Sequence, residues 1–272
     1  MIVRDEVIPD AKVNGININY NIFGEGEPLI LIIGLSSDQS NWRQTTEFFK
    51  KFYRTITLDN RGWGKSDKPP GPYTIKTMAD DTLGLMNHLG IEKAHILGVS
   101  MGGMIAQELA LNYPERVNKL IMGCTFARID ETSGFSPEIS KELEVYGKSS
   151  RDKESSQRLA ISIIDSSVNK GTSRMILLPL MKFAIKSSPL NGFIEQLDAL
   201  LAHDVKDRLG RIIASTLVIV GTDDRVIKPA SSDVIASLVP KSKLVKLKGG
   251  SHAFSGEMSS EFNKAVFDFL RS

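Results

Sequence analysis

The chain has few of the features that mark secreted or membrane-spanning proteins. Cys124 is the only cysteine among 272 residues, which excludes an intrachain disulfide and is typical of a reducing compartment. The longest apolar runs, such as residues 29–33, are far too short to cross a bilayer. The chain begins with Arg4, Asp5 and Glu6 close to its first residue, where a signal peptide would need an apolar stretch. We therefore expect a cytoplasmic protein with no membrane association.

The chain also lacks an excess of charge of one sign. It has 34 Lys and Arg against 32 Asp and Glu, a formal net charge of +2, and the two signs are interleaved along the sequence. Because the sequence contains no basic tract that could bind a phosphate backbone, we expect no nucleic-acid partner. The hydrophobic content of 41% is enough to bury a large core, and a single α/β domain with an insertion fits this length.

Segments with strand and helix patterns alternate over most of the chain. Apolar or alternating runs predict strands at residues 16–22, 29–33, 52–58, 94–99, 117–122, 216–220 and 244–247. Helical spacing or composition predicts helices at residues 74–89, 101–112 and 257–270. This alternation predicts an α/β fold, a mostly parallel central sheet flanked by helices on both faces. We assign that core to residues 1–126 and 206–272.

Residues 127–205 interrupt the alternation, because they carry no buried-strand signature. Helical patterns there centre on residues 136–146, 154–166, 172–186 and 192–202. An insert that leaves the carboxyl end of a strand lies over the crevice where such sheets bind ligands, so we expect a helical cap. Its apolar residues 175–178 and Phe183 are expected either to wall the pocket or to pack the cap on the core.

The most informative motif is residues 98–102, Gly-Val-Ser-Met-Gly, which follow a predicted strand and precede a predicted helix. A nucleophile elbow has this arrangement, because it holds its serine on a strained turn with the hydroxyl clear of the sheet. Small residues must flank the serine, since a Cβ there would collide with a neighbouring strand or helix. Ser100 is therefore the candidate nucleophile.

A serine nucleophile needs a general base, and imidazole titrates near neutral pH. His252 follows residues 249–251, Gly-Gly-Ser, directly after the last predicted strand. The carboxyl ends of parallel strands share one edge of a sheet, so His252 is expected beside Ser100. We interpret the other three histidines as structural: His88 at a helix end, His95 at the start of the elbow strand, and His203 where the insert rejoins the core.

The imidazole in turn needs an acid to fix its tautomer, and the loop after the predicted strand at 216–220 offers two. Asp223 and Asp224 are adjacent, and in an extended segment their side chains point in opposite directions, so one can face His252. We favour Asp224, with Asp223 as the alternative. The order Ser100, Asp224, His252 is the one expected for an elbow-type hydrolase.

An oxyanion site should complete the arrangement, and two backbone amides are candidates. Met101 follows the nucleophile and provides the first N–H. The loop at residues 34–37 follows the predicted strand at residues 29–33. Leu35 in this loop is expected to provide the second N–H, whether or not its side chain also belongs to the core.

With these residues in place, the chain resembles the α/β-hydrolase superfamily over essentially its whole length. The matching segments are residues 34–42, 59–66, 98–103, 122–129, 221–224 and 250–252. Within the superfamily it is most similar to the oxoadipate enol-lactonase group and related carboxylesterases. The resemblance selects Asp224 over Asp223 and implies a structural role for Arg61. It further implies a serine hydrolase that cleaves a small-molecule carboxylic ester or lactone, with no metal and no other cofactor.

Some features depart from the pattern or leave alternatives open. Many superfamily members carry His-Gly where residues 33–34 are Ile-Gly, although the enol-lactonase group also tends to lack that histidine. The insert contains no tryptophan to line a pocket. The same triad could serve a C–C bond hydrolase, or a proline iminopeptidase if Glu138, Glu142 and Glu144 held the substrate amine. A small-ligand receptor is a further alternative on this fold. The sequence carries no signal for an oligomeric state.

Overall fold

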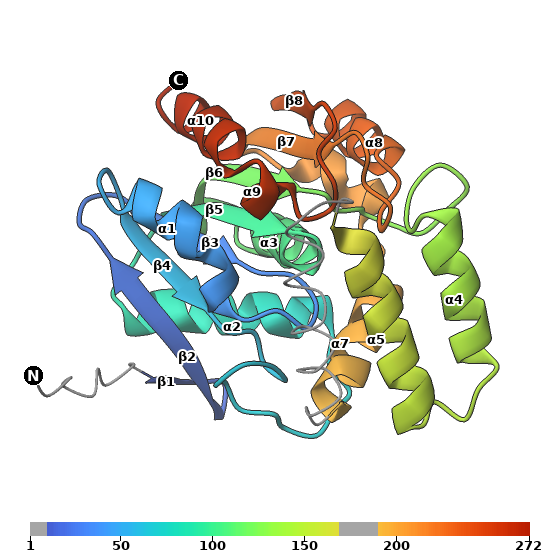
Figure 1. Ribbon diagram of the computed structural model, residues 1–272. Helices are drawn as coiled ribbons and strands as arrows, with labels where there is room; N and C mark the ends of the chain where they lie inside the picture. The colour runs from blue at the N-terminus through green and yellow to red at the C-terminus, as the bar shows by residue number, and fades with distance from the viewer. Residues whose placement is uncertain (1–9, 169–189) are drawn as a thin grey trace, which may run out of the picture.

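The computed structural model describes residues 10–168 and 190–272. Its centre is an eight-stranded sheet with the strand order β1-β2-β4-β3-β5-β6-β7-β8 (Figure 1). The strands are β1 (Asp10–Val13), β2 (Ile16–Phe23), β3 (Pro28–Ile32), β4 (Arg54–Leu58), β5 (Ala94–Val99), β6 (Val117–Gly123), β7 (Ser215–Gly221) and β8 (Ser242–Leu247). The pairs β1–β2 and β2–β4 are antiparallel and all others are parallel, which confirms the mostly parallel sheet.

Helices cover both faces of the sheet. One face carries α1 (Arg43–Phe49), α9 (Phe254–Glu257) and α10 (Ser259–Leu270), and the other carries α2 (Ile75–His88), α3 (Met101–Asn112) and α8 (Ala230–Leu238). Successive side chains of a strand point to opposite faces, so Leu29 and Leu31 of β3 join one core while Ile30 and Ile32 join the other. Continuous apolar runs are therefore buried on both faces.

The structure contains elements that the sequence pattern does not predict. The four residues of β1 pair only with β2, at an edge of the sheet. The seven-residue α1 and the nine-residue α8 are too short for a clear helical periodicity. The closing helix predicted at residues 257–270 corresponds to α10, which begins two residues later; the short α9 before it, separated by Met258 with a φ of −120°, was not predicted.

Three described α-helices lie between β6 and β7, beyond the carboxyl ends of the parallel strands (Figure 1). They are α4 (Pro137–Gly147), α5 (Lys153–Ser167) and α7 (Asn191–Leu201). Ser136 and Asp152 cap α4 and α5, each accepting a hydrogen bond from a backbone N–H of the first turn. The fourth predicted helix, with residues 175–178 and Phe183, lies outside the described residues. None of the described helices is long and apolar enough to cross a membrane.

The third of these helices, α7, is packed closely against the core. A Cβ built on Gly192 would lie 1.8 Å from the carbonyl oxygen of Gly62, in the turn after β4, so the two backbones are in direct contact. The side chains of Phe193 and Leu197 are buried with Tyr146 of α4 in a separate small cluster. The start of α7 is thus anchored to the sheet domain by backbone packing. The division into a core and a cap at residues 127 and 205 remains a prediction.

Candidate active site

Ser100 occupies the sharp turn between β5 and α3, with a φ of 55° and a ψ of −124°. This conformation costs a non-glycine residue about 1–3 kcal/mol, so the surrounding packing must hold it. A Cβ at Gly98 would lie 2.0 Å from the carbonyl oxygen of Gly102, and one at Gly102 would lie 2.1 Å from that of Ile32. The backbone of the elbow therefore has room only for glycine at these two positions, for the steric reason that the motif suggested.

The three polar side chains that the sequence singles out lie together at the carboxyl edge of the sheet. His252, after β8, places its Nε2 3.1 Å from Ser100 Oγ, and its Nδ1 lies 2.7 Å from Asp224 Oδ2, after β7. The other carboxylate oxygen of Asp224 accepts backbone N–H bonds from Val226 (2.8 Å) and Ile227 (3.0 Å). Asp224 is thus fixed on both oxygens, and its side chain is fully buried.

Asp223 points elsewhere. Its side chain is exposed and accepts a hydrogen bond from the Thr222 hydroxyl at 2.8 Å. The two adjacent carboxylates therefore lie in opposite environments, and Asp224 is the one that meets the imidazole of His252.

The electrostatics of the site change the basicity of His252. Burial lowers the pKa of its imidazole, but the negative charge of Asp224, the interaction with Cys124 and the hydrogen bond to Asp224 together outweigh burial and raise that pKa well above 6.5. The imidazole of His252 is therefore more basic than that of a free histidine, whose pKa is about 6.5.

The candidate oxyanion donors flank the serine. Met101 begins α3, and among the described residues no acceptor takes its backbone N–H or that of Leu35. A Cβ at Gly34 would lie 3.0 Å from Ser100 Cβ, so the loop after β3 passes directly against the serine. Asn60 donates from Nδ2 to the carbonyl oxygen of Ile33 at 2.9 Å and holds the start of this loop. The role of the two amides remains a prediction.

The other histidines lie away from the serine. His88 is exposed at the last residue of α2, and His95 is buried at the start of β5 with its Nε2 3.3 Å from Glu27. His203 is buried after α7 and places its Nε2 3.3 Å from the side-chain oxygen of Gln107. Desolvation, supported by the positive charge of Arg208, lowers the pKa of His203 to about 4, so it is neutral near pH 7. None of the three contacts Ser100.

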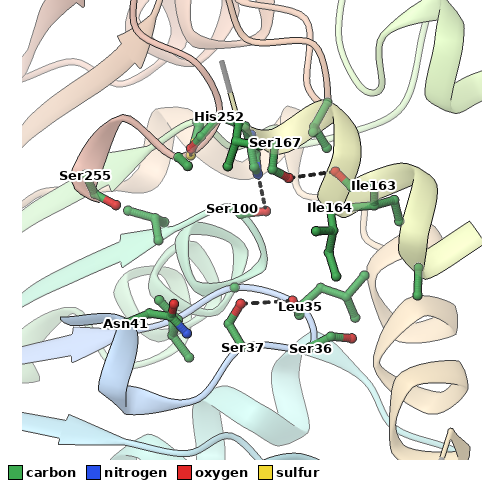
Figure 2. Close-up of a pocket in the computed structure, with 18 of the residues that line it drawn as sticks. Leu35, Ser36, Ser37, Asn41, Ser100, Ile163, Ile164, Ser167, His252 and Ser255 are labelled. Carbon is green, nitrogen blue, oxygen red and sulfur yellow. Dashed lines mark hydrogen bonds between the residues drawn. The ribbon is translucent and has the colours of Figure 1, made fainter. Parts of the chain in front are cut away.

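A cavity of about 200 Å³ opens onto Ser100 and His252 (Figure 2). Its described lining is mostly apolar: Ile33, Val99, Phe135, Ala160, Ile163, Ile164, Phe193, Leu200 and Val226. Ile163 and Ile164 come from α5, so this insert helix faces the serine across the cavity (Figure 2). The sequence pointed instead to residues 175–178 and Phe183, which lie outside the described residues, and it gave no signal for Ile163 and Ile164, because their place at the cavity depends on how α5 packs on the core.

Cys124 also borders the cavity, and sequence reasoning assigned it no role. Its buried thiol donates to the backbone carbonyl of His252 over 3.6 Å. Ligand atoms of Cys124, Asp224 and His252 lie within 4.8 Å of one another, the one such group among the described residues that could hold a metal ion. Asp224 and His252 are already joined by a short hydrogen bond, so the arrangement fits a base with its orienting acid.

Comparison with known proteins places this chain in a family. Residues 27–148 match the family model described as alpha/beta hydrolase fold. The chain is 30% identical over 251 residues to 3-oxoadipate enol-lactonase 2 of Acinetobacter baylyi, covering 92% of this chain and 91% of that protein. It is 27% identical to the putative carbamate hydrolase RutD of Azorhizobium caulinodans, over 96% of this chain and 98% of the relative.

A solved structure agrees. The enol-lactonase from Burkholderia xenovorans superposes with a TM-score of 0.85 at 30% identity, covering 97% of this chain and 100% of that one. Sequence relatives and a solved fold thus converge on one family along nearly the full length of the chain. The protein therefore belongs to the α/β-hydrolase family, and it is a hydrolase.

Proposed function

We propose that this hydrolase cleaves a carboxylic ester or lactone through an acyl-enzyme formed on Ser100. The observation that carries the proposal is the unbroken hydrogen-bonded series Ser100 Oγ, His252 and Asp224, with separations of 3.1 and 2.7 Å, at the floor of an apolar cavity. A hydroxyl, an imidazole and a buried carboxylate in this order form the arrangement that activates a serine for acyl transfer.

In the proposed mechanism, Ser100 Oγ attacks the substrate carbonyl carbon and its proton passes to His252 Nε2. The carbonyl oxygen becomes an oxyanion that accepts hydrogen bonds from the N–H groups of Leu35 and Met101, each worth about 3 kcal/mol in the transition state. His252 then returns the proton to the departing alkoxide, which in a lactone stays attached to the acyl group. Water repeats these steps on the acyl-enzyme, releasing the carboxylic acid and regenerating Ser100.

The imidazole of His252 must be neutral to accept the proton and charged while it holds it. Asp224 stabilises the charged form through the 2.7 Å hydrogen bond, and two backbone N–H groups keep the carboxylate in place. The raised pKa of His252 makes it a stronger base than an isolated imidazole.

The lining of the cavity supports an apolar substrate. Ile163 and Ile164 of α5 and Phe193 and Leu200 of α7 are among the apolar side chains that line the cavity. Such a surface favours a compact acyl or alkyl group, which gains from leaving water. We therefore expect short-chain esters and small lactones to be better substrates than charged ones.

The iminopeptidase alternative receives less support. A substrate amine would need an acidic partner in the cavity, but Glu138 and Glu144 of α4 are exposed, and Glu142 lies 3.9 Å from Arg158. None of these three lies among the described residues that line the cavity. They form a solvated face of α4 instead.

The test is a substrate panel with wild-type protein and Ser100→Ala. We expect turnover of short p-nitrophenyl esters and small lactones by the wild type, weaker activity on proline anilide, and a loss of turnover by at least about 10³-fold in the variant. Mass spectrometry after treatment with a serine-directed phosphonate should locate one adduct on Ser100. Full turnover by Ser100→Ala would refute the proposed nucleophile.

A further inference from the structure

The glutamine at position 196 lies at the junction between the insert and the candidate oxyanion loop. Gln196 belongs to α7 and is completely buried. Its Oε1 accepts the backbone N–H of Ser36 at 3.2 Å, and its Nε2 donates to the backbone carbonyl of Arg61 at 2.7 Å. One amide thus joins the insert to two loops at the carboxyl edge of the sheet, one after β3 and one after β4.

The contacts of Gln196 bear on the residue next to Ser36. Leu35 immediately precedes Ser36, and Ser36 has a φ of 53°, a conformation that a non-glycine residue adopts only when its neighbours hold it. Asn60 already holds the carbonyl of Ile33, on the other side of Leu35. The peptide N–H of Leu35 is therefore fixed from both sides, by Asn60 before it and by Gln196 after it.

The second contact of Gln196 is with a rigid part of the core. The side chain of Arg61 forms a buried, two-point ion pair with Asp81 of α2, with N–O distances of 2.5 and 2.7 Å. Because this pair holds the turn after β4 in place, the carbonyl of Arg61 is a fixed anchor for Gln196. Phe193 and Leu200, on the same helix as Gln196, line the cavity.

We propose that Gln196 is a positioning residue for the reaction: it fixes the Leu35 N–H as an oxyanion donor and couples the substrate-lining helix α7 to that donor. The proposal rests on the proposed function, because it assumes that the Leu35 N–H binds the oxyanion. It assigns to the insert a part in stabilising the transition state in addition to forming a wall of the cavity.

The test is the variant Gln196→Met, which removes the side-chain amide and keeps a side chain of similar size and shape. An oxyanion donor displaced by a fraction of an ångström should lower kcat by about 10- to 100-fold, with KM within about threefold. A trifluoromethyl ketone that forms a tetrahedral adduct on Ser100 places its oxygen where the oxyanion forms. Its inhibition constant should rise by the same factor as kcat falls.

Gln107→Met provides the matched control. Gln107 is equally buried, on α3, and its amide donates to the carbonyl of Phe126 at 3.2 Å, away from the Leu35 loop. This variant should lower the melting temperature about as much as Gln196→Met and keep kcat within about threefold of the wild type. If Gln196→Met does not fold, Gln196→Asn keeps the amide but is too short to span both partners, and it should shift kcat and the inhibition constant in the same direction.

The outcomes separate the two proposals. A folded Gln196 variant with wild-type kcat and wild-type affinity for the ketone overturns this inference, as does an equal loss of kcat in Gln107→Met. A wild-type protein that cleaves no ester or lactone and forms no adduct on Ser100 overturns the proposed function and this inference with it. A parallel change in kcat and ketone affinity, confined to the Gln196 variants, supports both.

Discussion

Protonation of His203 should destabilise the fold by an amount that the structure allows us to work out. His203 is buried after α7, with its Nε2 against Gln107 of α3, and burial together with the positive charge of Arg208 lowers its pKa to about 4, from about 6.5 for a free histidine. Below pH 6.5 the unfolded chain binds a proton at this position and the folded chain does not. The free energy of unfolding is therefore undiminished by His203 above pH 6.5, and it decreases as the pH falls from 6.5 toward about 4. The loss is about 2 kcal/mol at pH 5 and reaches about 3 kcal/mol below pH 4.

The measurement is the free energy of unfolding in urea at pH 8 and at pH 5, for the wild type and for His203→Gln. The glutamine keeps a polar partner for Gln107 but cannot be protonated, so the drop between the two pH values should shrink by about 2 kcal/mol. Replacement of the exposed His88 by Gln is the control and should leave the drop unchanged. Because the other titrating groups are the same in variant and wild type, their contributions to the drop in unfolding free energy cancel when the two proteins are compared. An equal drop in wild type and His203→Gln would refute the reasoning.

Two further predictions concern the triad. kcat/KM should fall to half its maximum at a pH above 6.5 as the pH is lowered, because the raised pKa of His252 keeps its imidazole protonated, and unable to accept the serine proton, at a higher pH than for a free histidine. A half-maximal pH at or below 6.5 would refute the raised pKa of His252. Asp224→Asn should lower kcat by about 10⁴-fold, because an amide leaves the imidazole in the wrong tautomer. The adjacent Asp223→Asn should keep kcat within about threefold, since the Asp223 side chain is exposed. Equal losses in a steady-state ester assay would rule out a specific Asp224–His252 pairing.

Much of this fold can be predicted from local patterns. The strands predicted at residues 94–99 and 117–122 correspond to β5 and β6 within one residue, because strands buried on both faces are mostly apolar. Elements whose stability comes from packing were not predictable in the same way. The seven residues of α1 contain Phe49, which is buried against the sheet, but too few turns to show a period.

The candidate site divides in a similar way. Ser100 can be recognised from the glycines that flank it in sequence. Glycine is required at positions 98 and 102 because a Cβ there would collide with neighbouring backbone atoms. His252 could be proposed because parallel strands end at one edge of the sheet. Gln196 had no such mark, because its partners Ser36 and Arg61 lie 160 and 135 positions away in the chain.

The sequence by itself determined the class of fold and the kinds of chemical group at the site, since periodicity, glycine placement and strand ends are local properties of the chain. Tertiary structure decided which of two adjacent carboxylates is buried against the imidazole, how far the pKa of that imidazole rises, and which insert side chains border the cavity. Those properties depend on distances and burial between segments remote in sequence, and only the packed chain sets them.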